Sequence, residues 1–183
     1  MNSFLNRLNV IGFFVATALV LLAASSNITR LFHSFDPYIE IHNPRVANYG
    51  YYDYNSEYRN VMAHTKRHAK SAVLKFDLDV ELSKLFTWNT KQIFVYIVAE
   101  YKTKKHPTNK VVIWDTVIDQ ADRMDADFFI ENLEAKYPLN DVADSLDNVD
   151  VTLSVNWEIT PVLGVFTLHG GKEVHSANVK IEK

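Results

Sequence analysis

An uncharged apolar run near the N-terminus, Val10 to Ala24, places the firmest limits on this chain. Extended to Leu8–Ser25 the run has 18 residues, which as an α-helix would be about 27 Å long. The apolar core of a secretory signal peptide is usually about 7–15 residues long, whereas a membrane-spanning helix needs about 20. Length alone therefore leaves two alternatives open, a permanent anchor and a signal peptide cleaved after Ser26. Both place the remainder of the chain outside the cytosol.

The charges that flank this run predict its orientation. Arg7 is the only charged side chain before it, and no acidic residue precedes it. Positive charge on the N-terminal side predicts a cytosolic N-terminus, and Arg30 on the other side weakens this asymmetry without reversing it. If the run is an anchor, the chain divides into a cytosolic tail (1–7), a transmembrane signal-anchor helix (8–25) and one translocated domain (26–183).

The composition after the apolar run excludes several classes of function. All 22 acidic residues lie there, and the formal net charge of the whole chain is −3. A nucleic-acid-binding surface would need a clustered basic patch, so the charge argues against one. The chain has no cysteine, which excludes Cys nucleophiles and Cys-based zinc sites.

The translocated domain has the periodicity of β-structure. Leu74 to Leu82 alternates apolar and charged residues, which predicts a strand with one buried and one solvated face. Gln92 to Tyr101 is almost continuously apolar, which suits a central strand covered on both faces or one that also faces a partner. Further strands are predicted at Lys110–Ile118 and Val149–Trp157, with weaker candidates at Tyr38–His42, Val165–Leu168 and Val174–Ile181.

Polar connections such as Lys102–Asn109 are of hairpin type. Antiparallel strands joined in this way predict a mainly β fold, a single antiparallel β-sandwich domain after one N-terminal transmembrane helix. Arg45–Lys70 is polar and rich in Tyr, and we interpret it as a long surface loop. Asp119–Tyr137 is ambiguous between helix and irregular strand, because Phe129, Leu133 and Tyr137 fall at helical spacing.

Two Asp-x-Asp pairs, Asp77/Asp79 and Asp125/Asp127, are the kind of motif with which a glycosyltransferase would hold a divalent metal and nucleotide phosphates. The chain has no Gly-rich phosphate loop and no βαβ pattern to receive a nucleotide. Asp77 and Asp79 also lie on the solvent side of an alternating strand. We therefore interpret both pairs as charged surface residues.

Three further motifs are weak. His64 and His68 have the spacing of metal ligands on a helix, but their neighbours are basic, so a solvated loop is expected. No Ser lies in a nucleophile-elbow context. Asn27-Ile28-Thr29 is an N-glycosylation sequon. It directly follows the apolar run, so we expect Asn27 to be mostly unmodified.

Three motifs in the middle of the chain resemble those of a known family. Trp88–Phe94 reads WNTKQIF, Ala99–Tyr101 reads AEY, and Val111–Asp115 reads VVIWD. The first of these is the most specific, and the later segment Val151–Trp157 fits as well. On these residues the chain resembles, over nearly its full length, the third, non-catalytic subunit of the eukaryotic signal peptidase complex.

The resemblance implies a single-pass type II protein of the endoplasmic reticulum membrane, with its β-domain in the lumen against the catalytic subunit. That partner would supply the serine protease machinery that removes signal peptides from precursors. The resemblance implies no catalytic, metal-binding or cofactor-binding residue in this chain. Residues expected to be structural or to contact other subunits are Phe86, Trp88, Asn89, Lys91, Gln92, Phe94, Tyr96, Glu100, Tyr101, Trp114 and Asp115. A secreted or membrane-tethered binding module without a protease partner is the alternative.

Overall fold

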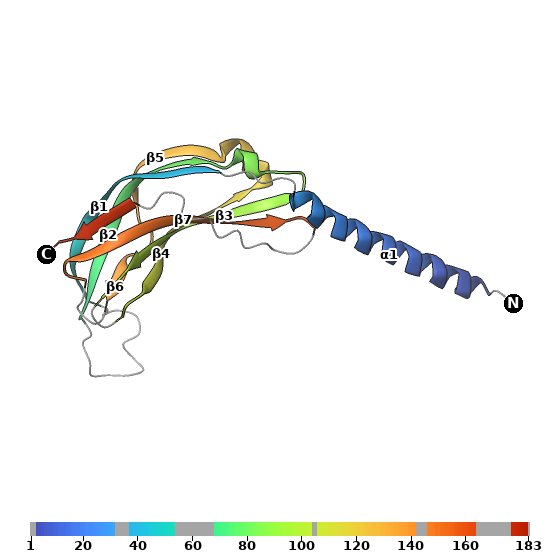
Figure 1. Cartoon of the computed structure of the whole chain (residues 1–183), viewed down its shortest axis with the longest axis horizontal. Coiled ribbons are helices and arrows are strands. Elements are labelled where there is room, and N and C mark those ends of the chain that lie inside the picture. Colours follow the sequence, from blue (N-terminus) through green and yellow to red (C-terminus); the bar gives the residue numbers. More distant parts are fainter. Residues whose placement is uncertain are drawn as a thin grey trace.

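The N-terminal apolar run forms a long helix that projects away from the rest of the molecule (Figure 1). The computed structural model describes residues 3–31, 37–53, 68–103, 106–141, 146–163 and 177–182. The helix α1 is Phe4–Leu31, and nearly every side chain of its apolar window, Phe4–Ser25, is exposed. A long helix that is apolar on all sides, with none of its apolar window buried, has the properties of a membrane span.

Two antiparallel sheets make up the domain. The first sheet has the order β1-β2-β5, with β6 also paired to β2; the second has the order β4-β3-β7-β8. The strands are β1 (Tyr38–Asp53), β2 (His68–Glu81), β3 (Thr90–Tyr101), β4 (Asn109–Asp119), β5 (Asp127–Glu134), β6 (Leu139–Asp141), β7 (Val149–Pro161) and β8 (Ala177–Ile181), with short 3-10 helices η1 (Ser83–Leu85) and η2 (Gln120–Asp125). The predicted mainly β, sandwich-like fold is confirmed.

The core lies between the sheets because the strands alternate. On β2, Leu74, Phe76 and Leu78 are at most 1% exposed, and on β3 Ile93 and Val95 are fully buried. Each such side chain contributes about 1.5–3 kcal/mol by leaving water. The intervening residues of both strands point to the outer faces. The four main predicted strands are therefore found close to their expected positions.

The predicted surface loop 45–70 is wrong at both of its ends. β1 continues to Asp53 and β2 begins at His68, and these two residues are paired. Tyr-rich, Gly-poor sequence suits a strand as well as a loop, since aromatic residues have high β-propensity. Residues 54–67 lie outside the described residues, as does the candidate strand at 165–168. The last strand begins at Ala177, and residues 174–176 of its predicted range are also undescribed.

The ambiguous segment 119–137 is a 3-10 helix followed by a strand. Asn132 has a left-handed φ of 54°, and the register of β2 and β5 shifts between Phe76 and Leu78. This bulge changes which face the following residue occupies. Phe129 is therefore 55% exposed, while Leu133 packs against the core. The helical spacing of Phe129 and Leu133 therefore does not reflect a shared face, because the bulge places them on opposite faces of the sheet.

Candidate interaction surface

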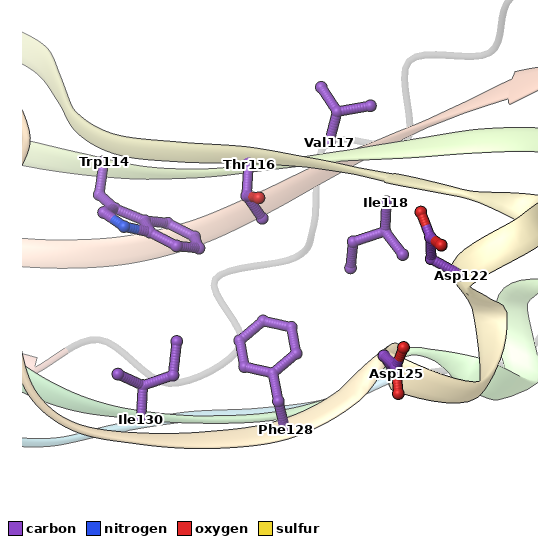
Figure 2. A pocket seen from close by; sticks show the side chains of 8 residues that line it. All are labelled: Trp114, Thr116, Val117, Ile118, Asp122, Asp125, Phe128 and Ile130. Atoms are coloured by element: carbon purple, nitrogen blue, oxygen red, sulfur yellow. The ribbon is translucent and has the colours of Figure 1, made fainter.

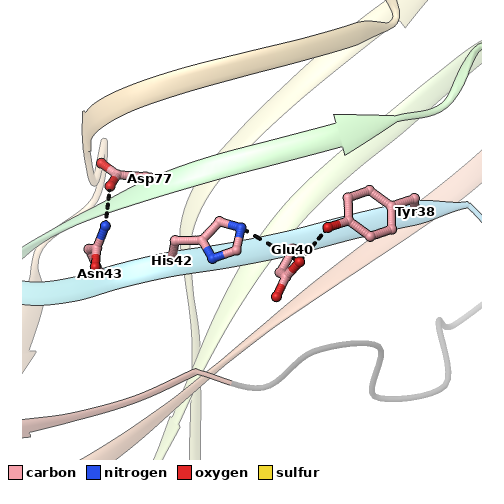
Figure 3. Close-up of polar contacts among 5 residues, drawn as sticks. All are labelled: Tyr38, Glu40, His42, Asn43 and Asp77. Atoms are coloured by element: carbon pink, nitrogen blue, oxygen red, sulfur yellow. Dashed lines mark hydrogen bonds and ion pairs between the residues drawn. The ribbon is translucent and has the colours of Figure 1, made fainter.

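The outer face of the first sheet is polar along the part of β1 and β2 drawn in Figure 3, whereas Phe129 of β5 is an exposed apolar side chain on the same face. The Tyr38 hydroxyl donates to the carboxylate of Glu40, and His42 Nε2 lies 3.6 Å from Glu40 Oε2. Farther along β1, Asn43 Nδ2 donates to Asp77 Oδ2 at 2.8 Å. These side chains satisfy one another or face water, as expected of a solvated sheet face.

The aspartates of the two Asp-x-Asp pairs have separate roles in the fold. The amide of Asn132 donates to Asp77 Oδ1 at 2.8 Å and, together with the Asn43 side chain, lowers the pKa of Asp77. Asp127 accepts hydrogen bonds from the amide and hydroxyl of Ser83, at 2.9 and 2.7 Å. Burial acts to raise the pKa of Asp127, but these bonds lower it overall. Asp77 and Asp127 thus join neighbouring segments of the first sheet.

The outer face of the second sheet is apolar over β3 and β4. Phe94, Tyr96 and Val98 alternate with the buried residues of β3 and are half-buried. On β4, Val117 pairs with Phe94 and Val112 pairs with Val98, and these two valines are 51% and 40% exposed. Cross-strand partners share a face of the sheet. We call these five residues (Phe94, Tyr96, Val98, Val112 and Val117) the outer patch.

Aromatic contacts organise the centre of the outer patch. The rings of Phe94 and Tyr96 are stacked, with centroids 5.2 Å apart. The Tyr96 hydroxyl donates to Glu158 Oε1 at 3.4 Å. Burial, and then the charge of Glu158, raise the pKa of Tyr96, so the phenol stays neutral. The five residues of the patch are therefore uncharged and ordered, while carboxylates lie beside them, since Asp115 of β4 pairs with Tyr96 and Glu158 of β7 pairs with Phe94.

Charged side chains lie at the ends of the patch. Lys110 Nζ is 2.9 Å from Glu100 Oε2, on the β3–β4 pair beyond Val98 and Val112. At the start of β3, Lys91 is exposed and Gln92 is half-buried. An apolar centre with a polar rim is the arrangement of protein–protein interfaces.

Five of the other residues that were predicted to be structural or to contact other subunits lie apart from the outer patch. Tyr101 and Trp114 are 6% and 5% exposed and belong to the core. Burial, and then the charge of Asp141, raise the pKa of Tyr101. Phe86 is half-buried against the core. Trp88 is 66% exposed, whereas its neighbour Asn89 is 3% exposed.

Trp114 and Asp115 contact the segment that follows β5. Lys136 Nζ lies 5.5 Å from the centroid of the Trp114 ring and also donates to the main-chain oxygen of Asp115. Tyr137 N donates to Ile113 O at 3.0 Å. A hydrogen bond to the Asp115 carboxylate raises the pKa of Tyr137. These contacts close one end of the gap between the edge strands β4 and β5.

The rest of that gap is an open cleft of about 250 Å³ between the two sheets (Figure 2). Trp114, Ile118 and Phe128 line its apolar part, and Asp122 and Asp125 lie at one end. In Figure 2 the side chain of Val117 points away from the cleft, toward the outer patch.

The last kind of site to consider in this chain is a metal-binding site. Within the residues that the structure describes, there is no group of three or more His, Cys, Asp or Glu side chains that could hold a metal ion. Of the two predicted candidates, His68 begins β2 and His64 lies outside the described residues. Asn27 lies within the last turns of α1.

Sequence reasoning identified part of the outer patch and missed the rest. Phe94 and Tyr96 were expected to be structural or to contact other subunits, whereas Val98, Val112 and Val117 were not singled out. The continuous apolar character of β3 was the available signal for Val98. On β4 a register shift beside Ile113 interrupts the alternation, so Val112 and Val117 could not be assigned to one face from spacing.

Comparison with known proteins gives one family. A sequence model of the family described as "Signal peptidase subunit" matches residues 1–183. "Signal peptidase complex subunit 3" of Gallus gallus is 32% identical over 93% of this chain and 90% of its own length. The same-named protein of Schizosaccharomyces pombe is 27% identical over 93% of this chain and 86% of its own.

A shorter and stronger match covers the central part of the chain. "Signal peptidase complex subunit 3" of Caenorhabditis elegans is 40% identical over 113 residues, which are 60% of this chain and 62% of the nematode protein. The match to the Yarrowia lipolytica protein likewise spans 61% of that protein. These two alignments cover less than two thirds of the relatives' lengths, whereas the family model covers the chain throughout. The chain belongs to the signal peptidase subunit family.

Proposed function

We propose that this chain is a non-catalytic subunit of the signal peptidase complex of the endoplasmic reticulum. In this proposal α1 anchors it in the membrane with the β-domain in the lumen, and the domain holds the catalytic subunit at the lumenal membrane surface. The complex would remove signal peptides from nascent secretory and membrane proteins. Family membership and the exposed apolar helix support this proposal.

The single observation that carries the proposed role is the group of adjacent exposed apolar side chains on the outer face of the second sheet. A sheet face in contact with water is normally polar, as the first sheet is around Glu40 and His42. The outer patch instead exposes Val117 and Val112 beside stacked aromatic rings. Contiguous exposed apolar surface with a polar rim marks a protein-contact site. We infer that the catalytic subunit docks on the outer patch.

Docking on the outer patch would contribute to the reaction by positioning the catalytic subunit. The patch lies on β3 and β4, whose inner faces pack into the core, so a partner bound there would be held by a rigid element. Its active site would then stand at a fixed height above the bilayer, where the bond to be cut lies just beyond the apolar segment of the precursor. Orientation alone can lower a reaction barrier by several kcal/mol without any reacting group from this chain.

A photo-crosslinking amino acid tests which face is docked. Placed at Val117, 51% exposed in the outer patch, it is expected to crosslink to the catalytic subunit in microsomes. Phe129 is the matched control, since it is 55% exposed on the opposite outer face. Crosslinking from Phe129 but not from Val117 would move the docking surface to the first sheet and contradict the proposal.

A further inference from the structure

Three large apolar side chains are exposed together at one end of the domain. Trp88, in the turn before β3, is 66% exposed, and Val162 and Leu163, directly after β7, are 56% and 53% exposed. The two segments are neighbours, because Thr90 at the start of β3 pairs with Pro161 at the end of β7. We call Trp88, Val162 and Leu163 the apolar tip.

The buried side chain of Asn89 fastens the two halves of the tip together. Asn89 Nδ2 donates to Leu163 O at 2.8 Å, and Asn89 Oδ1 accepts from Leu163 N at 2.9 Å. Val162 N also donates to the main-chain oxygen of Asn89 at 2.8 Å. These bonds satisfy three main-chain groups of the 162–163 segment within the protein, Val162 N, Leu163 N and Leu163 O. The tip can therefore enter a less polar environment without leaving these groups unsatisfied.

The tip lies at the end of the domain that is joined to α1. Tyr38, the first residue of β1, pairs with Glu81, from which η1 leads to Trp88. The connection between α1 and β1 is only residues 32–37. Figure 1 shows the start of β3 and the end of β7 at the end of the domain from which the helix projects. The far end of β3 points away from the helix.

The length of α1 places this end close to the bilayer surface. The helix has 28 residues, six more than its 22-residue apolar window. Six helical residues rise about 9 Å, and the headgroup layer on each side of the hydrocarbon core is about 5–8 Å thick. The base of the domain therefore meets the bilayer at headgroup level.

The chemistry of the tip suits that layer. Trp is enriched at membrane–water interfaces because its ring is apolar and its N–H can reach polar groups. Lys84, within η1, has a side chain that is 69% exposed and lies 3.6 Å from Glu81 Oε2, and Lys91 is exposed at the start of β3. Lys side chains at this height can reach lipid phosphates while their stems lie along apolar surface.

We propose that the apolar tip inserts into the headgroup layer of the bilayer that α1 spans, with phospholipid as its partner. The domain is then attached at two points, the helix and the tip, which fixes its tilt as well as its height. This inference rests on the membrane anchoring proposed above and is independent of which face binds the catalytic subunit.

Site-directed spin labelling tests the inference, because the chain has no cysteine of its own. Single cysteines replace Trp88, Leu19 within α1, and Thr108 at the opposite end of β3, in the full chain reconstituted in phosphatidylcholine vesicles. Collisions with oxygen relative to a water-soluble nickel chelate give the depth of each label. We expect bilayer depth at W88C intermediate between L19C, within the bilayer, and T108C, in water.

The outcomes separate this inference from the anchoring itself. L19C in the bilayer with W88C as water-exposed as T108C would overturn the inference and leave the anchor intact. L19C in water would show that α1 does not span and would remove the basis of both. Wild-type protein gives a second measurement, since Trp114 and Trp157 are 5% and 7% exposed. Brominated lipid is expected to quench fluorescence in the wild type and not in W88F; equal quenching in both contradicts the inference.

Discussion

Lys70 Nζ lies 2.6 Å from Asp147 Oδ2, and this ion pair joins β2 of the first sheet to the turn before β7 of the second. Lys70 is only 6% exposed. The same carboxylate also accepts a hydrogen bond from the Tyr49 hydroxyl of β1. Three segments that are far apart in sequence thus meet at one charged group, at the end of the domain opposite Trp88.

Removal of the carboxylate is expected to be the most destabilising change to this group. D147A would leave the buried ammonium of Lys70 without this counter-charge, at a cost of about 2–4 kcal/mol in the free energy of unfolding. K70M is expected to cost less, because Asp147 has a side chain 29% exposed and can be hydrated. Chemical denaturation of the chain in detergent, followed by Trp fluorescence, measures both. A larger loss in K70M than in D147A would contradict this account.

Lys70 illustrates what could not be predicted from the sequence. Alternation predicted the strands around Leu74 and Ile93, because that signal is local to each strand. Lys70 was placed in a surface loop, since the partner that permits its burial is 77 positions away in sequence. Local composition carries no information about such a partner. The extension of β1 to Asp53 was hidden in the same way, by polar sequence that becomes a strand through its pairing with β2.

Only the part of the outer patch that lies on β3 could be predicted from the sequence. Phe94 and Tyr96 belong to an apolar run, so a face beyond the core was expected there. The bulge beside Ile113 hides the alternation of β4, and the exposed pair Val162 and Leu163 follows a strand whose pattern had already ended. Trp88 and Asn89 are adjacent, yet one is exposed and the other buried. Their motif was visible in the sequence, but their separate roles required the turn geometry.

Substitution of Asn89 should weaken the fold at the end of the domain that carries the apolar tip. N89A removes the two hydrogen bonds that the Asn89 side chain makes to the main chain of Leu163. We expect the free energy of unfolding to fall by about 2–3 kcal/mol, because Leu163 N and Leu163 O lose these partners. N178A is the matched control: the Asn178 side chain accepts one exposed hydrogen bond from Thr152, and a change within about 0.5 kcal/mol is expected. Equal denaturation midpoints for N89A and wild type would contradict the structural role of Asn89.

Acid should weaken the bulge in β5 through Asp77. Hydrogen bonds from Asn132 and then Asn43 lower the pKa of Asp77 below its usual 3.8. A lowered pKa in the folded state means that the stabilisation is fully present above 3.8 and is lost as the pH falls through the folded-state value. The stability difference between wild type and D77N should therefore shrink as the pH falls below that value. Denaturation midpoints of the two proteins measured from pH 6 to about pH 2.5 check this; a difference that widens in acid contradicts it.

The N-terminus distinguishes the anchored subunit from a secreted binding module. We expect the mature chain to retain residues 1–26, with a mass close to 21.0 kDa apart from modification of the N-terminus. The chain should also be insensitive to endoglycosidase, because Asn27 lies two residues beyond the end of the apolar window and the proposed anchoring would hold it at the bilayer surface. Intact-mass analysis of protein from microsomes measures both properties. A chain that begins at Asn27 would support the secreted module instead.

The central claim is that the outer patch holds the catalytic subunit, and the most direct measurement is complementation in cells depleted of this protein. V112K/V117K places two charges on the patch, whereas F129K places a charge on the opposite face at similar exposure. We expect V112K/V117K to fold, to lose co-purification with the catalytic subunit at least tenfold, and to accumulate unprocessed secretory precursors, while F129K restores both. Normal co-purification and processing with V112K/V117K would contradict the account.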